Sequence, residues 1–285
     1  MDEKMHMPFH IVNAFTDRPF KGNPAGVVLE SDKLNEKDMQ KIASELKCSE
    51  TAFVMEGNNA DFRVRFFSPL REVDLCGHAT IATFYTMEEL GFVRDEHFTM
   101  ETKAGILGIE IKEGAVFMEQ AKPVFRDVNI DKSRIADALG IKVGEIDDLP
   151  IEAVSTGLFS LNVPIEHIET MEKIKPDFEK VKELCKSSGV GSIFAFTFET
   201  LNEDSFVHAR CFAPLYGINE DPVTGTANGA LGAYLKKHGL LKSMIYKSEQ
   251  GYEIGRDGTV FVDVSGDKVK VGGKAYIALQ GEVNL

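Results

Sequence analysis

The sequence predicts a mixed α/β (α+β) protein of two related halves, each an antiparallel, barrel-like sheet around a central helix. Three observations lead to this fold class: strands that alternate apolar and polar residues, two helices that are apolar or small on nearly all sides, and an internal repeat. A helix at a protein surface carries a single apolar stripe, so a helix without a polar face belongs inside a sheet that wraps around it.

The strand pattern has a period of two residues and is interrupted by glycine or Asn/Asp turns, which favours hairpins and antiparallel or mixed sheets. Strands of this kind are predicted at residues 61–67, 107–112, 115–120, 192–198, 205–212, 259–264 and 268–273.

Helical patterns are fewer. Ordinary amphipathic helices are predicted at residues 34–46, 132–139 and 177–185, and the two apolar helices at residues 78–90 and 226–238. The apolar helices are rich in alanine and glycine, which would allow the strands of a surrounding sheet to approach closely. Both helices lie inside the repeat.

The repeat relates residues 65–91 to residues 210–239. Each copy contains Arg-x-Phe-[Ser/Ala]-Pro-Leu, then Gly-x-Ala, then a closing glycine 14 positions after the first one (91 − 77 and 239 − 225). The loop between the first two pieces is three residues longer in the second copy (225 − 210 against 77 − 65). Duplication of one half is the simplest account.

Composition limits the classes of function. The 285 residues are 43% hydrophobic, enough to bury a core without metal or disulfide staples, and the four cysteines show no zinc-ligand spacing. We therefore expect a reducing, cytoplasmic location. A net charge of −13 argues against nucleic acid and anionic membranes as partners, and no run of about 20 apolar residues or signal peptide is found.

The loops before the two apolar helices carry the candidate chemistry. The helices start at Gly77 and Gly225, and the first turn of a helix offers unpaired N–H groups and positive potential. Two such starts facing one cleft between the halves would bind a carboxylate. The alternative is that both loops only cap their helices.

Single residues near these loops leave functional and structural interpretations open. His78 could exchange a proton, donate a hydrogen bond to an anion or serve only the structure. Glu50 lies between a helix and a strand and could be only a cap. Asp221 is held extended before a proline and could be only a turn residue. Cys76 could be a reactive thiol at a helix start or a small packing residue. The sequence contains no GxxxxGK[ST], GxGxxG, GxSxG or HExxH motif, which favours a mechanism without cofactor or metal.

Four motifs, in order, resemble the PhzF-like phenazine biosynthesis proteins of the diaminopimelate epimerase-like superfamily. They are VNAFTDRPFKGNPAGVVL at 12–29, SETAFV at 49–54, RFFSPLREVDLCGHAT at 65–80 and EDPVTGTANGALGAYL at 220–235. The resemblance implies a first half at residues 1–118 plus 277–285, completed by the last strand, and a second half at residues 119–276. It also implies an active site in the cleft between the halves.

The resemblance further implies a cofactor-independent isomerase, in the EC 5 class, that moves a proton on a small carboxylate-bearing substrate of unknown identity. It gives the acid/base role to Glu50 and assigns His78 and Asp221 to positioning the substrate and tuning Glu50. Substrate binding falls to Ser49, Gly77, Gly225 and Thr226. A homodimer and a role in a biosynthetic process are further implications.

Two other functions compete with this hypothesis. A two-cysteine racemase or epimerase would use Cys76 as one base, but alignment of Gly77 with Gly225 places Thr224 where the second thiol is needed. A threonine hydroxyl is too weak an acid or base for that step. A non-catalytic protein that binds a small ligand is the second alternative. In the isomerase hypothesis Cys76 is a packing residue whose substitution is mild.

Overall fold

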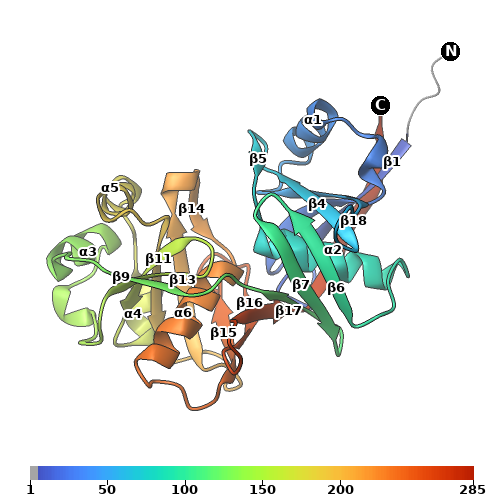
Figure 1. Cartoon of the computed structure of the whole chain (residues 1–285). Coiled ribbons are helices and arrows are strands. Elements are labelled where there is room, and N and C mark those ends of the chain that lie inside the picture. Colours follow the sequence, from blue (N-terminus) through green and yellow to red (C-terminus); the bar gives the residue numbers. More distant parts are fainter. Residues whose placement is uncertain (1–5) are drawn as a thin grey trace. The chain divides into compact units, whose positions relative to one another are not determined.

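We describe the fold from a computed structural model, in which residues 6–285 are described (Figure 1). The chain forms two compact units. Unit 1 is Met1–Glu119 together with Gly272–Leu285, and unit 2 is Gln120–Val271. The sequence placed these boundaries after residues 118 and 276.

Nine strands and two α-helices among the described residues lie within unit 1. Its elements are β1 (His6–Ala14), β2 (Asn23–Val28), the 3-10 turn η1 (Ser31–Lys33), α1 (Glu36–Leu46), β3 (Thr51–Glu56), β4 (Phe62–Phe67), β5 (Glu72–Val73), α2 (Gly77–Glu89), β6 (His97–Thr102), β7 (Gly105–Lys112), β8 (Ala115–Glu119) and β18 (Ala275–Asn284).

Unit 2 follows the same plan with additional helices. Its elements are β9 (Val124–Asp127), α3 (Lys132–Leu139), η2 (Val143–Glu145), β10 (Glu152–Ser155), β11 (Phe159–Pro164), α4 (Ile168–Lys173), α5 (Phe178–Ser188), β12 (Ser192–Thr197), β13 (Val207–Ala213), η3 (Pro214–Tyr216), β14 (Ile218–Asp221), α6 (Gly225–Lys237), β15 (Ile245–Gln250) and β16 (Gly258–Asp263). Strand β17 (Lys270–Gly273) spans the second boundary.

The two units share one order of strand pairing. In unit 1, β18–β1–β2 is antiparallel, β2–β3 parallel, β3–β4 antiparallel, β4–β6 parallel and β6–β7–β8 antiparallel. In unit 2, β9–β10–β11 is antiparallel, β11–β12 parallel, β12–β13 antiparallel, β13–β15 parallel and β15–β16 antiparallel. The duplication read from the sequence is therefore present in the fold, and the sheets are mixed with mainly antiparallel pairs.

Helices α2 and α6 are the central helices, each among the strands of its own unit (Figure 1). Helix α2 contacts β1, β2, β3, β8 and β18, and α6 contacts β10, β11 and β16. In α2 the buried Thr80, Thr83 and Thr86 hydroxyls donate to the carbonyls four residues earlier, which satisfies them inside an apolar environment. In α6 a Cβ atom at Gly232 would lie 2.7 Å from Val262 Cγ1, so glycine is needed for the close approach of β16.

Capping residues explain where predicted and observed helix ends differ. Helix α1 begins at Glu36 instead of residue 34 because the Asn35 side chain accepts a hydrogen bond from the Asp38 amide. Asp177 likewise caps α5 and accepts from the amides of Glu179 and Lys180. The sequence did not predict α4, whose six residues are too few to show a helical period.

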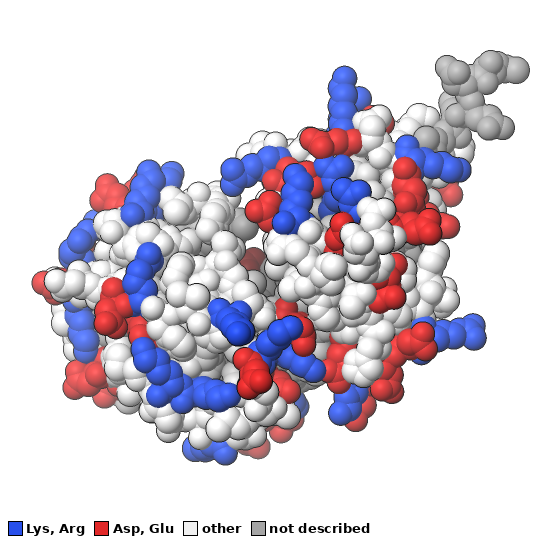
Figure 2. Space-filling view, in the orientation of Figure 1, with Lys and Arg blue, Asp and Glu red and all other residues white. Residues whose placement is uncertain are grey.

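One hydrophobic core cluster of unit 2 lies between helices α3 to α5 and one face of the sheet, and includes Ile135, Leu161, Val181, Ile193 and Phe212. In the described residues we find no helix long and apolar enough to cross a membrane. On the face drawn in Figure 2, acidic and basic side chains are interspersed, in keeping with a net charge spread over the surface.

Candidate active site

Three reactive side chains meet at the start of α2 in unit 1. Glu50 lies in the connection before β3, and its carbonyl accepts a hydrogen bond from the Gly26 amide of β2 at 3.0 Å. Cys76 is the N-cap residue of α2, and His78 lies in the first turn. Two neighbouring strands and one buried helix therefore hold this Glu50–Cys76–His78 cluster.

The distances inside the cluster are short. Cys76 Sγ lies 3.6 Å from Glu50 Oε2 and 3.4 Å from His78 Nδ1. His78 Nε2 lies 3.6 Å from Glu50 Oε2 and 3.1 Å from the hydroxyl oxygen of Ser49. The Glu50 carboxyl is therefore within reach of both a thiol and an imidazole.

Burial controls the protonation of Glu50. The Glu50 side chain is 17% exposed and that of His78 10%. Desolvation raises the pKa of the Glu50 carboxyl, and hydrogen bonds from Ser49 and Cys76 lower it by less, so the net shift is upward. A carboxyl group with a raised pKa can both give and accept a proton nearer neutral pH, as a general acid/base requires.

The start of α6 in unit 2 carries a different set of groups. Asp221 ends β14, and its Oδ2 accepts a hydrogen bond from the Thr224 hydroxyl at 2.6 Å. The Gln250 amide group donates to the Asp221 carbonyl at 2.9 Å and to the Thr224 hydroxyl at 3.1 Å. Gln250 also accepts from the Thr224 amide and from the Asn228 side chain, both at 3.1 Å. Thr224 and Gln250, both neutral, therefore hold Asp221 in place.

Thr224 and Cys76 occupy equivalent positions. Both are N-cap residues with extended backbone, at φ −118°, ψ 100° and φ −141°, ψ 117°, and neither caps its helix with its side chain. Gly225 and Gly77 follow as the first helical residues. The alignment of the two loops made from the sequence is therefore correct in three dimensions.

The start of α6 has no thiol at the position equivalent to Cys76. Cys211 is buried in β13, opposite Asp221, and burial raises its pKa to about 12. Cys185 is buried in α5, where desolvation also raises its pKa to about 12. These thiols lack the thiolate character that a cysteine base needs.

The structure brings together part of the predicted site. Ser49, Glu50 and His78 form one cluster in unit 1, while Asp221 lies in unit 2 beside the α6 start. Thr226 is in the first turn of α6, and its carbonyl accepts from Thr156 at 3.2 Å. Sequence reasoning treated Cys76 as a packing residue and missed its contacts with Glu50 and His78. It also missed Gln250 and Asn228, although an asparagine in an otherwise apolar helix was an available signal.

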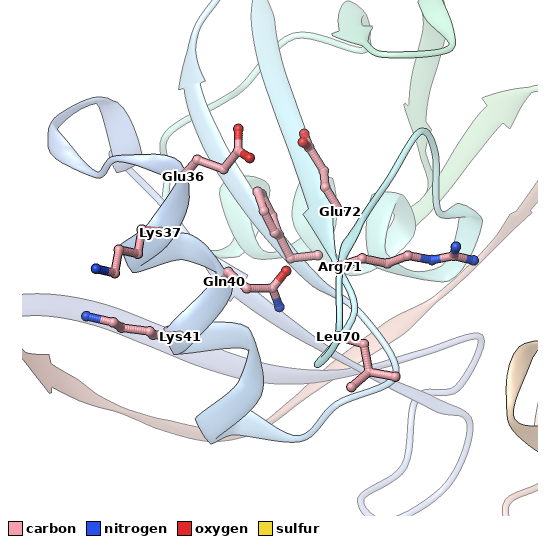
Figure 3. A pocket seen from close by; sticks show the side chains of 8 residues that line it. Glu36, Lys37, Gln40, Lys41, Leu70, Arg71 and Glu72 are labelled. Atoms are coloured by element: carbon pink, nitrogen blue, oxygen red, sulfur yellow. The ribbon is translucent and has the colours of Figure 1, made fainter.

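A separate pocket lies on the surface of unit 1, between α1 and the turn before β5 (Figure 3). Arg65 bridges its two acidic residues: its guanidinium donates to Glu36 at 2.7 Å and to Glu72 at 2.7 and 2.8 Å. The lining includes Gln40, Leu70 and Arg71, and none of the predicted site residues. Arg65 pairs with both acidic residues and Lys103 with Glu72, and no residue of the Glu50–Cys76–His78 cluster lines this pocket.

Comparison with known proteins gives one consistent result. The family model described as phenazine biosynthesis-like protein matches residues 12–281. A Bacillus subtilis protein named uncharacterized isomerase YfhB is 43% identical over 267 residues, covering 90% of this chain and 91% of that protein. The uncharacterized isomerase YddE of Escherichia coli is 34% identical and covers 95% of this chain and 96% of its own.

Solved structures agree with the sequence matches. A PhzF family phenazine biosynthesis protein from Bacillus anthracis is 37% identical, has a TM-score of 0.91 and covers 99% of this chain and 100% of its own. A hydroxyproline epimerase from Agrobacterium vitis, at 14% identity and a TM-score of 0.62 over 100% of this chain and 94% of its own, shares the fold alone. The predicted diaminopimelate epimerase-like fold class is confirmed.

Proposed function

Because the chain belongs to the phenazine biosynthesis-like protein family, we propose that it is an isomerase in which Glu50 transfers a proton on a small carboxylate-bearing substrate. Its relatives of 34 to 43% identity that are named isomerases assign the chain to that enzyme class. The mechanism, the substrate class and the residue roles are the proposal.

One observation carries the proposal: the partly buried Glu50 carboxyl lies 3.6 Å from the His78 imidazole and 3.6 Å from the Cys76 thiol. In its ionised form Glu50 accepts a proton from a carbon of the substrate, and in its protonated form it returns that proton at another carbon of the same conjugated or activated system. No group is lost and no redox change occurs, so the reaction needs no co-reactant.

His78 and Ser49 have supporting roles. The Ser49 hydroxyl lies 3.1 Å from His78 Nε2, and the imidazole in turn faces the Glu50 carboxyl. In this proposal the pair keeps the carboxyl directed at the reacting carbon. Displacement of a catalytic group by about 1 Å can lower the reaction rate by about 100-fold.

The α6 start supplies binding in the same proposal. First-turn amides beginning at Gly225, together with Thr226 and those beginning at Gly77, are suited to a carboxylate because helix N-termini carry positive potential. Asp221 positions the substrate through its fixed carboxylate.

Absence of cofactor, a cytoplasmic location, a homodimer and a biosynthetic role are parts of the proposal that follow from family membership and composition. A cysteine-based racemase is a weaker reading, because Thr224 takes the place of the second thiol.

The experiment is solvent exchange. Candidate carboxylates are incubated with the full chain in D2O, and deuterium uptake at carbon is followed by NMR. The proposal expects exchange with wild type and a loss of at least about 100-fold in Glu50→Gln, the usual size of a general acid/base contribution.

Glu56→Gln is the matched control, because Glu56 is an exposed glutamate at the end of the same β3 strand. It should exchange like wild type. A carboxylate that binds, as judged by thermal shift, without any exchange would overturn the isomerase proposal in favour of a binding protein.

A further inference from the structure

The Glu50–Cys76–His78 cluster holds one sulfur, one nitrogen and one oxygen ligand atom within 4.8 Å of one another. Thiolate, imidazole and carboxylate are the three side-chain types that bind Zn²⁺ in proteins. All three residues are buried or partly buried, so an ion there would be shielded from bulk water.

The distances between the three ligand atoms are close to those in a tetrahedral zinc site. With metal–sulfur bonds of about 2.3 Å and metal–nitrogen and metal–oxygen bonds of about 2.0 to 2.1 Å, tetrahedral ligand atoms are about 3.3 to 3.6 Å apart. In the cluster, Sγ to Oε2 is 3.6 Å, Nε2 to Oε2 is 3.6 Å and Sγ to Nε2 is 3.9 Å. Because Sγ lies nearer to Nδ1 of His78 (3.4 Å) than to Nε2 (3.9 Å), a rotation of the His78 ring or of the Cys76 side chain is needed to direct Nε2 and Sγ at one ion.

The backbone holds the three ligands in place. Cys76 and His78 are two residues apart at the start of a buried helix, and the main chain of Glu50 is bonded to β2. Three protein ligands leave a fourth position open, which is the arrangement of zinc sites that accept an exchangeable group. The second, equivalent loop cannot form such a site, because Thr224 replaces the thiol.

We propose that Glu50, Cys76 and His78 form a binding site for a thiophilic divalent cation, Zn²⁺ above all, and that an ion bound there blocks the isomerase. On binding, the Cys76 thiol releases its proton to solvent and the thiolate, the Glu50 carboxylate and neutral His78 Nε2 become ligands. The blocking rests on the proposed function, since it removes the carboxylate that transfers the proton. The binding does not rest on it.

A second cluster provides an internal comparison. His167, Glu169 and Glu199 also offer three ligand atoms, but all three residues are exposed and none is a thiol. Glu199 already accepts from the Ile168 amide at 2.7 Å and lies 3.2 Å from His167 Nδ1. Zn²⁺ prefers a site with a buried thiolate to a site of exposed carboxylates and imidazole. The Glu50–Cys76–His78 cluster should therefore bind Zn²⁺ first.

The test measures metal binding to the full chain after treatment with a chelator. Zn²⁺ is titrated by calorimetry, and Co²⁺ is used as a coloured substitute whose bond to a thiolate gives a charge-transfer absorption band. We expect one tight equivalent of Zn²⁺ and a Co²⁺–thiolate band in wild type and in the control His167→Gln. Cys76→Ser should lose the band, and both Cys76→Ser and Glu50→Gln should weaken binding at least tenfold.

Retention of the band in Cys76→Ser, loss of tight binding in His167→Gln, or no tight equivalent in wild type would each overturn the metal site. Circular dichroism of each variant excludes unfolding as the cause of lost binding. In the exchange assay, Zn²⁺ should abolish deuterium uptake and a chelator should restore it. Exchange that continues at saturating Zn²⁺ would refute the block, whereas tight binding by a protein that catalyses no exchange would refute the proposed function alone.

Discussion

The starts of α2 and α6 are two versions of one structure that carry different chemistry. Both follow an arginine that pairs with a glutamate through two hydrogen bonds: Arg65 with Glu72 at 2.7 and 2.8 Å, and Arg210 with Glu220 at 2.8 Å. In both, the arginine lies 5.1 Å from a phenylalanine ring centre. The supporting framework was retained in both copies.

The difference lies in the residues that the framework presents. The α2 start brings a thiol, an imidazole and a carboxyl with a raised pKa together, whereas the α6 start surrounds Asp221 with the neutral Thr224 and Gln250. This difference supports the proposal that the first copy moves a proton and the second holds a fixed charge. Four experiments test this difference between the two helix starts.

The largest effect concerns the two arginines. Arg210 is 5% exposed and also donates to the carbonyls of Met171 and Ile174, so Arg210→Met would leave several buried groups unpaired and cost about 3–5 kcal/mol. Arg65 is 16% exposed, and its partner Glu72 also contacts Lys103, so Arg65→Met should cost about 1–2 kcal/mol. Urea unfolding of both variants measures the difference, and equal costs would show that the two frameworks are energetically alike.

His78→Gln tests the Glu50–Cys76–His78 cluster at the start of α2. Glutamine keeps a polar group near Glu50 but cannot replace both ring nitrogens, so the carboxyl loses its orientation toward the substrate. We expect a roughly 100-fold fall in the exchange rate with little change in substrate KM. A raised KM at unchanged kcat would instead place His78 among the residues that bind the substrate.

The pH dependence of stability tests the environment of Glu50. Its pKa is raised by burial in the folded chain, so this group stabilises the protein fully below its unfolded pKa and loses that contribution as the pH rises through the folded value. Glu50→Gln cannot ionise and should therefore be more stable than wild type at neutral pH and equal to it at acid pH. Unfolding free energies from pH 4 to 8, roughly the range around a raised glutamate pKa, measure this difference. A gap that widens toward low pH would contradict the upward shift.

The smallest effect concerns the leucine of the repeated Pro-Leu. Leu215 packs partly buried against the unit 2 core, whereas Leu70 is 90% exposed. Leu215→Ala should cost about 1–2 kcal/mol and Leu70→Ala less than about 0.5 kcal/mol. A large loss for Leu70→Ala in thermal unfolding would show that this exposed leucine is covered in solution.

Local patterns predicted the framework well. Both central helices were located within one residue, at 78–90 against Gly77–Glu89 and at 226–238 against Gly225–Lys237. The sequence shows that these helices are buried, because a helix that is apolar or small on all sides has no polar face for solvent. The paired glutamates of the framework were not recognised, because they follow their arginines after seven and ten residues (72 − 65 and 220 − 210).

The contacts of the site were less predictable. Glu50 and Cys76 are 26 residues apart, and no periodicity indicates which way two loop side chains turn. Gln250 holds Asp221 from β15, which pairs in parallel with β13, a strand that begins 38 residues earlier in the chain (245 − 207). The resemblance to a family supplied Glu50, whereas the thiol beside it became visible only in the structure.

The proton-transfer role of Glu50 is tested by comparing Glu50→Gln with Cys76→Ser in one exchange assay on one substrate. In Cys76→Ser a hydroxyl replaces the thiol, so a hydrogen-bond donor to Glu50 is kept. The account predicts that Glu50→Gln loses at least about 100-fold in exchange rate and that Cys76→Ser loses less than about tenfold. Exchange that survives in Glu50→Gln and disappears in Cys76→Ser would contradict the account and make the thiol the proton-transfer group.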